Sequence, residues 1–349
     1  MTSPVVDDLV AFASIPAPTF AEEARLRWLE ERLARSRGSL RRDGAGNLIW
    51  RLGEGRPRVL LLTHVDTVFR ADTPLRFSER DGVVVGPGIG DNAAAVVTVV
   101  DVVSRVALQD DAPLTVAFTV GEEGLGNLRG ANEACERLRP ESAIAVEGHG
   151  LDHVLVDAVG SVRLRVSVTG PGGHSWADRG TPSAVHALLR LGAEVSEAGA
   201  SETPVNVGVV SGGQSVNTIA AEAECVVEMR ALDEPALTEF SRKLDALRVD
   251  PPLALRIDEV GRRPAGRLDR AAPLLAVVRE IRERMGLADA LGAGSTDANA
   301  ALSRGIPAVT LGVARGALMH TLEEWIDLRS LETGASQLER VLVRLFDGA

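Results

Sequence analysis

The chain has 349 residues, more than one simple hydrophobic core usually contains, so two domains are expected. Hydrophobic residues make up 45% of the sequence, which argues against global disorder. The formal net charge is −11 and no basic block offsets it, which argues against binding to nucleic acid or to an anionic membrane surface.

The N-terminal segment and the cysteines bear on the location of the protein. The start, MTSPVVDDLVAFASIP, carries acidic residues early and lacks the basic start and continuous apolar core of a signal peptide. No run approaches the roughly 18 apolar residues of a membrane span. Cys135 and Cys225 lack metal-ligand or redox spacing, so both are expected to be free buried thiols. These features predict a cytoplasmic protein.

The first half of the chain alternates helical and extended patterns. Helices are expected at 5–14 and 20–35, and an Ala/Val-rich helix at 92–107. Short β-rich runs stand between them, at 47–51, 58–63, 114–119 and 142–146. Buried strands that alternate with helices predict an α/β sandwich with a mostly parallel sheet. In such sheets the ligand site lies beyond the carboxyl ends of the strands.

From about residue 161 the pattern changes to that of an inserted α+β domain. Strands and helices are expected in the order β-α-β-β-α-β, typical of a ferredoxin-like unit, at 161–170, 183–198, 203–208, 222–230, 234–247 and 254–259. The α/β pattern then resumes. The sequence therefore predicts a catalytic domain in two parts, 1–160 and 263–349, interrupted by a domain at 161–262.

Histidines and acidic residues stand where several of these strands end. They are His64 and Asp66 in LLLTHVDTV, Asp91 in GPGIGDN, Glu122 and Glu123 in AFTVGEEG, Glu147 in AIAVEGHG, and His320 in GALMHTLEEW. Two histidines and three carboxylates suit two adjacent divalent ions, with another carboxylate left free as a base. Imidazole and carboxylate without thiolate fit Zn²⁺ first, and Mn²⁺ or Co²⁺ next. The pattern predicts a metal-dependent hydrolase.

The residue types also indicate roles within this set. Adjacent residues after a strand point in different directions, so we expect Glu123 to bind metal and Glu122 to act as the base on a bound water. Asp66 could fix the tautomer of His64 or lie beside the metal itself. Asp91 could cap the following helix, a role compatible with bridging two ions.

Further candidates lie near Glu147 and in the inserted domain. His149 and His153 compete with Glu147 as ligands, but the glutamate is favoured because it directly follows the apolar run AIAV. His174, in GPGGHSWADRG, could donate to a developing oxyanion; the alternative is an ordinary surface-loop histidine. Two further residues could hold a substrate carboxylate or amide oxygen, namely Asn217 and Arg230.

The combination of these motifs with an inserted ferredoxin-like domain resembles the dinuclear-zinc exopeptidase and deacylase family. That family includes glutamate carboxypeptidase, tripeptide aminopeptidase, aminoacylase and succinyl-diaminopimelate desuccinylase. The resemblance covers essentially the whole chain. It implies that Asp91 bridges two ions, with His64 and Glu147 completing one site and Glu123 and His320 the other. It also implies that Glu122 is the general base and that Asp66 is the partner of His64.

The same resemblance implies roles for the inserted domain and for a later segment. His174 is similar to the lid histidine that, in dimeric relatives, reaches the neighbour's active site and polarises the scissile carbonyl. Asn217 and Arg230 match lid positions that hold the substrate. The run GSTDANAALSRGIPAVTLG, with Thr296 and Asp297, resembles a segment that lines the substrate pocket in peptidase members. A lid and dimerisation domain, and hence a homodimer, are implied.

A pairing surface and a branch of the family can also be suggested. The strand at 161–168 and the helix at 183–198 are candidates for an isologous dimer surface. Many relatives have lysine two positions after the bridging aspartate and then glycine, whereas this chain has Asp91 followed by Asn-Ala-Ala-Ala, which removes no ligand. Glutamate at position 147 is more typical of the carboxypeptidase and deacylase branches than of the aminopeptidases.

The leading hypothesis is an exopeptidase of carboxypeptidase type that acts on small peptides, and its close rival is an N-acyl-amino-acid deacylase. A silent binding protein of the same fold is a third reading, weakened by the intact ligand set and the intact Glu122. A hydride-transfer enzyme built on GPGIG is a distant fourth, because no dinucleotide fingerprint accompanies that motif.

Overall fold

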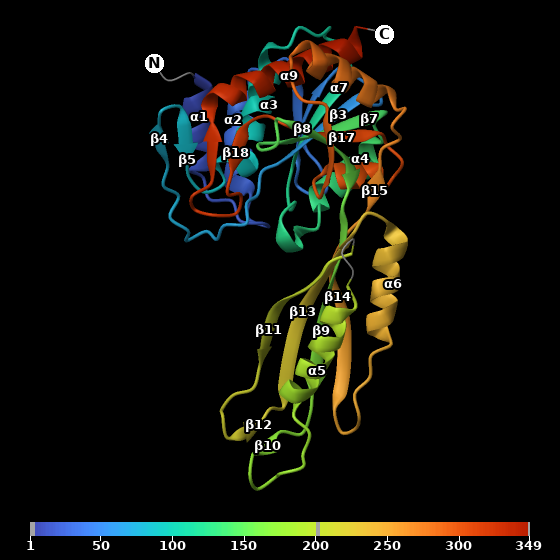
Figure 1. Ribbon diagram of the computed structural model, residues 1–349. Helices are drawn as coiled ribbons and strands as arrows, with labels where there is room; N and C mark the ends of the chain where they lie inside the picture. The colour runs from blue at the N-terminus through green and yellow to red at the C-terminus, as the bar shows by residue number, and fades with distance from the viewer. Residues whose placement is uncertain (1–3, 200–202, 348–349) are drawn as a thin grey trace. The chain divides into compact units, whose positions relative to one another are not determined.

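The computed structural model describes residues 4–199 and 203–347 (Figure 1). The chain divides into two units, one formed by Met1–Ala158 with Arg267–Ala349 and the other by Val159–Gly266. Among the described residues, none of the helices combines the length and apolar character that crossing a bilayer requires. Cys135 and Cys225 are both free and buried, as predicted.

The first unit is built on a sheet whose centre is parallel, as predicted. Its strand order is β1-β2-β6-β3-β7-β17-β8-β15, with β16 paired to β8. The four parallel central strands are β6 (Leu114–Thr119), β3 (Val59–His64), β7 (Ser142–Glu147) and β17 (Ala308–Gly312). The flanking strands are β1 (Ser39–Arg42), β2 (Leu48–Leu52), β8 (His153–Ala158), β15 (Gly266–Arg267) and β16 (Ala290–Gly294). All six residues of β3 and of β6 are buried, which explains their nearly continuous apolar sequences.

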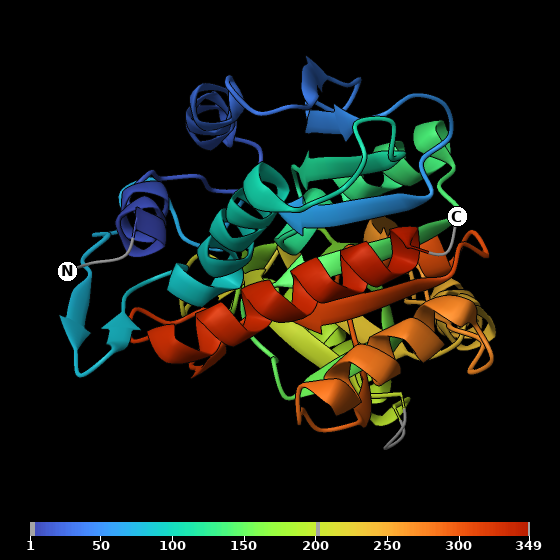
Figure 2. The same cartoon turned by 90° about the horizontal axis from the view of Figure 1, so that it is seen from above.

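Helices cover this sheet. They are α1 (Pro4–Ala13), α2 (Glu23–Leu33), α3 (Ala95–Arg105), α4 (Arg129–Leu138), α7 (Pro273–Arg284), α8 (Ala298–Leu302) and α9 (Leu328–Phe346). Helices α3, α9 and α7 lie side by side, α3 against β3 and β7 and α7 against β17 (Figure 2). The valine-rich α3 is buried over most of its surface because the sheet and neighbouring helices enclose it. That packing overrides the weak helix preference of valine.

A second, small sheet in the first unit joins segments far apart in the sequence. Its order is β18-β19-β5-β4. The strands are β4 (Ser78–Arg80), β5 (Val83–Val85), β18 (Arg315–Ala317) and β19 (Trp325–Asp327). Strand β5 leads towards Asp91 and β19 follows His320, so their antiparallel pairing draws these two chain segments together.

The second unit has the predicted ferredoxin-like order. Its elements are β9 (Gly160–Thr169), α5 (Ala184–Glu197), β11 (Val205–Gly212), β13 (Glu222–Ala231), α6 (Glu234–Asp245) and β14 (Ala254–Arg263). The sheet order is β11-β13-β9-β14, with antiparallel pairing, and both helices share one apolar core with the sheet. A ribbon of β10 (Gly173–His174) and β12 (Thr218–Ile219) extends the unit.

The strand order limits one sequence-based prediction, that of a pairing surface on the strand at 161–168 and the helix at 183–198. Strand β9, which covers the expected pairing strand at 161–168, is hydrogen-bonded on one side to β13 and on the other to β14. A strand paired on both sides offers no edge to a second chain. The edge strands of this sheet are β11 and β14.

Candidate metal centre

The parallel direction of the central strands brings predicted site residues together at the carboxyl ends of these strands. His64 is the last residue of β3, Glu147 is the last residue of β7, and Glu122 follows the end of β6 by three positions. Strand β3 lies between the other two, with His64 opposite Thr119 of β6. The carboxyl ends of three adjacent strands therefore deliver these side chains to one place.

Asp91 lies between the two predicted histidine ligands. His64 Nε2 is 3.1 Å from Asp91 Oδ1, and His320 Nε2 is 3.0 Å from Asp91 Oδ2. His64 Nε2 is also 3.5 Å from Glu147 Oε2, while His320 Nε2 is 3.3 Å from Glu123 Oε1. Each imidazole thus faces one oxygen of the shared aspartate and one further carboxylate.

The donor set fits divalent metal ions. The ligand atoms of His64, Asp91 and Glu147 lie within 4.8 Å of one another, and those of Asp91, Glu123 and His320 do the same. Nitrogen and carboxylate oxygen donors at this spacing suit Zn²⁺, and the two oxygens of one aspartate can serve two ions. The two trios have Asp91 in common, so the geometry fits two neighbouring ions.

The local conformation at Asp91 explains why this carboxylate faces inward. The helix expected at 92–107 begins only at Ala95, and Ala94 occupies the N-cap position of α3. Asp91 itself has non-helical angles, φ −94° and ψ 92°, within the irregular turn Ile89–Ala94. Asp91 therefore does not cap the helix, and both of its oxygens are directed to histidines.

Asp66 fixes both His64 and the Glu122–Glu123 pair. His64 Nδ1 lies 3.2 Å from the backbone oxygen of Asp66 and 3.6 Å from Oδ1. A carbonyl oxygen only accepts, so Nδ1 is protonated, and Nε2 faces the ligand cluster. The Asp66 carboxylate accepts from the Thr19 hydroxyl at 2.9 Å and from the backbone N–H groups of Glu122 and Glu123 at 3.0 and 2.9 Å. Hydrogen bonds to a charged group contribute roughly 1.5–3 kcal/mol each.

Glu122 is placed beside both trios. Its side chain is buried, and its ligand atoms lie within 4.8 Å of those of His64 and Glu123. Gly121 precedes the pair with φ +67°, a conformation that side-chain-bearing residues rarely adopt, so glycine permits the sharp turn after β6. This turn, together with the hydrogen bonds from the two backbone N–H groups to Asp66, holds the carboxylates of Glu122 and Glu123 next to each other.

Electrostatics within the cluster favour charged imidazoles in the metal-free protein. Burial opposes the charge on His64, but Glu147, Asp66 and Asp91 outweigh it and hold the pKa of His64 well above its usual value. Hydrogen bonds to Asp91 and Glu123 raise the pKa of His320 to about 10. Burial raises the pKa of Glu147 to about 7, although His64 opposes the shift.

His149 and His153 are not part of either trio. His149 Nε2 lies 2.7 Å from the fully buried Glu324 carboxylate, and His153 is exposed at the start of β8. Glu324 also accepts hydrogen bonds from the backbone around Asp91. Its role was missed from the sequence, where the only signal was its position four residues after His320.

Thr296 and Asp297 lie buried at the same end of the main sheet. The Thr119 hydroxyl donates to Asp297 Oδ2, and the Thr296 hydroxyl lies 2.7 Å from that of Thr310. Their exposed fractions are 8% for Thr296 and 1% for Asp297. The structure thus sets both side chains within the sheet's packing, and their assignment to substrate binding stays a prediction.

The candidates of the second unit lie on its ribbon and its sheet. His174 in β10 pairs with Thr218 in β12, next to Asn217. The backbone N–H groups of Trp176 and Ala177 donate to His174 Nδ1 at 3.2 and 3.3 Å. Nδ1 is therefore an acceptor and the proton resides on Nε2, which makes Nε2–H a hydrogen-bond donor.

Asn217 and Arg230 already have partners within the second unit. Asn217 Oδ1 accepts from the Ser215 hydroxyl at 2.7 Å. The guanidinium of Arg230 is ion-paired with Glu228, which also pairs with Arg163 at 3.0 Å. A substrate carboxylate bound by Arg230 would therefore compete with Glu228.

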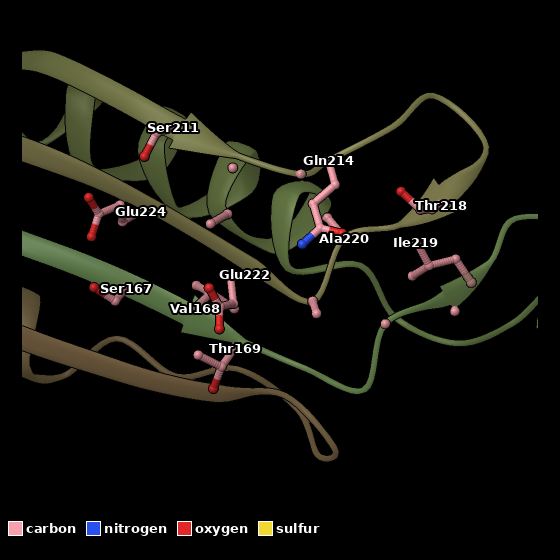
Figure 3. Close-up of a pocket in the computed structure, with 16 residues that line it drawn as sticks. Ser167, Val168, Thr169, Ser211, Gln214, Thr218, Ile219, Ala220, Glu222 and Glu224 are labelled. Carbon is pink, nitrogen blue, oxygen red and sulfur yellow. The ribbon is translucent and has the colours of Figure 1, made fainter.

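A hollow of about 660 Å³ lies in the second unit, between β9, β13 and the ends of β11 and β12 (Figure 3). Its polar lining residues are Ser167, Thr169, Ser211, Gln214, Thr218, Glu222 and Glu224. Its described lining holds no imidazole, thiol or cationic side chain. The hydroxyl groups of this hollow therefore have no imidazole or lysine among the described lining residues to activate them, and its two glutamates are the acid–base groups of that lining.

The parallel α/β unit and its imidazole–carboxylate cluster define a metal-dependent hydrolase. The sequence pattern of Peptidase family M20/M25/M40 matches residues 60–344, and the chain belongs to this family. The [LysW]-lysine hydrolase of Deinococcus radiodurans is 28% identical over 351 residues, which cover 96% of this chain and 95% of that protein.

Other relatives have different names. An acetylornithine deacetylase of Pasteurella multocida is 29% identical over 222 residues, 57% of each chain. A probable carboxypeptidase of Paracoccidioides brasiliensis is 28% identical over 211 residues, 52% of this chain and 47% of the relative. Among solved structures, a tripeptidase of Staphylococcus aureus superposes with a TM-score of 0.79 at 20% identity over 98% of both chains. That likeness concerns the fold.

Proposed function

We propose that the protein is a two-metal exopeptidase of carboxypeptidase type, which hydrolyses the amide bond next to the free carboxylate of a small peptide. The observation that carries the proposal is the position of Asp91, with one oxygen directed to each of two imidazoles and with Glu122 close by. An N-acyl-amino-acid deacylase is the alternative, and the name of the Pasteurella multocida relative favours it.

The metal-binding roles follow from the two trios. His64, Asp91 and Glu147 would hold one ion, and Asp91, Glu123 and His320 the other. Zn²⁺ suits these donors best, with Co²⁺ and Mn²⁺ as substitutes. When bound, such ions polarise a carbonyl and lower the pKa of water towards about 7.

The chain's own residues supply the proton transfer and the oxyanion contact. Glu122 accepts the proton of the attacking water and then delivers it to the leaving amine. His174 donates from Nε2 to the developing oxyanion, a role supported by the two backbone N–H groups that occupy Nδ1. Asn217 and Arg230 hold the substrate carboxylate, and Thr296 and Asp297 shape its pocket.

We further propose that the second unit is a lid and dimerisation domain and that the protein is a cytoplasmic homodimer. Edge strand β11 exposes Val209 and Val210, and helix α5 exposes Leu189. A hollow of about 260 Å³ lies between α5 and β11, lined mainly by apolar side chains. An apolar edge strand of this kind suits strand pairing with a second copy. The buried free cysteines support a reducing compartment.

Hydrolysis of a substrate panel tests the function. The metal-reconstituted protein is incubated with dipeptides, a tripeptide, and N-acetyl, N-succinyl and folyl amino acids, each with and without chelator. Chelator-sensitive cleavage of peptides at the carboxyl-terminal bond supports the carboxypeptidase. Cleavage of only the N-acyl amino acids selects the deacylase, and no turnover with two bound ions per chain points to the silent binding protein.

A further inference from the structure

A fully buried carboxylate holds the turn that carries Asp91. Glu324 Oε2 accepts from the backbone N–H of Gly88 at 2.8 Å, and Oε1 accepts from the N–H groups of Gly90 and Asp91 at 3.0 and 2.7 Å. His149 Nε2 lies 2.7 Å from Oε1 and completes the set. Four donors converge on one carboxylate, which has an exposed fraction of 0%.

The backbone of this turn packs too closely against His149 and Glu324 to leave room for a side chain at Gly90. A Cβ atom on Gly90 would lie 2.1 Å from His149 Nε2 and 2.7 Å from Glu324 Oε1. Glycine at this position therefore lets the backbone approach the Glu324 carboxylate, so that consecutive N–H groups can point at it. The contact sets the path of the backbone directly before the Asp91 side chain.

Glu324 also ties the His320 segment to the Asp91 segment. The backbone oxygen of Glu324 accepts from the N–H of Gly86 at 2.8 Å, and β19 then pairs with β5. His320 lies four residues before Glu324 in the same segment, so one residue connects two ligands of the trio Asp91, Glu123 and His320. The trio of His64, Asp91 and Glu147 is connected to Glu324 less directly, through the shared Asp91 and through His149, which lies two residues after Glu147.

His149 supplies the Glu324 side chain with a side-chain donor. Its side chain is 9% exposed, and a carboxylate accepts, so Nε2 is the protonated nitrogen. Within the described residues Nδ1 has no hydrogen-bond partner. The imidazole is therefore held by the Glu324 contact and by packing around Gly90 and Gly316.

We propose that Glu324, supported by His149, is a positioning residue that sets the affinity of the site formed by Asp91, Glu123 and His320. The inference rests on the proposed function, because it concerns binding of the second ion. Outer partners that orient metal ligands typically change metal affinity by about 10- to 100-fold when removed. The loss of Glu324 acts on the ion through Asp91 and His320, since the metal-ligand trios do not include Glu324 itself.

Metal titration of the full-length apoprotein tests this proposal. Co²⁺ is added to wild type, Glu324→Gln and Glu323→Gln while visible absorption reports occupancy of each site. Glu323 is an exposed neighbour, so its variant makes the same chemical change outside the contact. We expect Glu324→Gln to weaken binding of the second equivalent about 10- to 100-fold, and Glu323→Gln to match wild type.

Two further readouts separate positioning from general stability. Excess Co²⁺ should restore the kcat of Glu324→Gln with KM unchanged, and amide hydrogen exchange at Gly88, Gly90 and Asp91 should accelerate. If Glu324→Gln does not fold, His149→Leu is tested instead, because it leaves the three backbone hydrogen bonds to Glu324 in place. It should weaken the second equivalent to a smaller extent, and His149→Gln, which keeps a donor, should recover the affinity.

The outcomes distinguish this inference from the proposed function. If wild type does not bind two ions per chain, the proposed two-metal function is wrong. If wild type binds two ions and Glu324→Gln binds both as tightly as Glu323→Gln, the positioning role is wrong and the metal site stands. Where Glu324→Gln does not fold, the positioning role is overturned if His149→Leu, His149→Gln and wild type all bind the second equivalent of Co²⁺ with the same affinity.

Discussion

Arg25 donates from Nη1 to the backbone oxygen of Val65 at 2.8 Å, and Val65 lies between His64 and Asp66. The same guanidinium donates to the carbonyl oxygens of Ile15 and Ala13. Arg25 is 1% exposed, and burial lowers its pKa to about 10, although Asp66 and Asp91 oppose the shift. A buried cation thus supports the strand end from which His64 extends.

The first prediction concerns stability. Arg25→Met should destabilise the metal-free protein by about 3 kcal/mol, because two buried carbonyl oxygens and one part-buried carbonyl oxygen lose their donor, at roughly 1–3 kcal/mol for each buried one, and relief of the buried charge offsets part of that. Urea unfolding measures the change. Arg27→Met, on the exposed side of the same helix, is the control and should change stability by less than about 0.5 kcal/mol. Equal effects of the two variants would contradict a supporting role for Arg25.

The second prediction concerns the base. Glu122→Gln should bind two ions per chain and lose about 10²- to 10⁴-fold in kcat, since glutamine keeps the shape of the side chain and cannot accept the water's proton. Metal analysis and steady-state kinetics on the same preparation measure both quantities. A fully active variant would remove Glu122 from the mechanism, whereas loss of metal would make it a ligand.

The gathering of the candidate ligands could be predicted from the sequence because the signal is local. His64 and Glu147 close buried strands, and parallel strands place their carboxyl ends together. Glu324 gave no such signal, because its hydrogen bond with Gly88 joins residues 236 positions apart in the sequence. The strands that bring the two segments together, β5 and β19, have only three residues each and leave little pattern in the sequence. The edge role of β11 was missed for a similar reason, since strand order depends on long-range pairing.

The third prediction concerns His174, the proposed lid histidine. His174→Ala should lower kcat about 10²- to 10³-fold with both ions bound, as expected for loss of one oxyanion donor. His186→Ala, which removes an exposed histidine from helix α5 of the same unit, is the matched control and should leave kcat unchanged. If the two variants have the same kcat as wild type, His174 is an ordinary surface-loop residue.

The fourth prediction concerns oligomeric state. Wild type should be a dimer by light scattering, and Val210→Lys should produce monomers, because a charge on the exposed apolar edge of β11 opposes strand pairing. Arg256→Glu changes charge on the opposite edge strand, β14, and should leave the dimer intact. A monomeric wild type at about 50 µM would refute the homodimer, since a stable dimer has a much smaller dissociation constant.

The last prediction concerns pH. In the metal-free protein the pKa of His64 is well above its usual value and that of His320 is raised to about 10, so both imidazoles are positively charged at neutral pH, with both ring nitrogens protonated. Because the folded pKa of His320 exceeds the unfolded value of 6.5, its contribution to apoprotein stability is complete below about 6.5 and is lost as the pH rises through about 10.

Metal binding must displace these protons, and the proton of Glu147, whose pKa is raised to about 7. The apparent affinity for Zn²⁺ should therefore rise between about pH 6 and about pH 9. Titration calorimetry in buffers with different protonation enthalpies measures both the affinity and the number of protons released. An affinity that does not change with pH, together with no proton release, would mean that the imidazoles of the two trios are neutral before the ions bind.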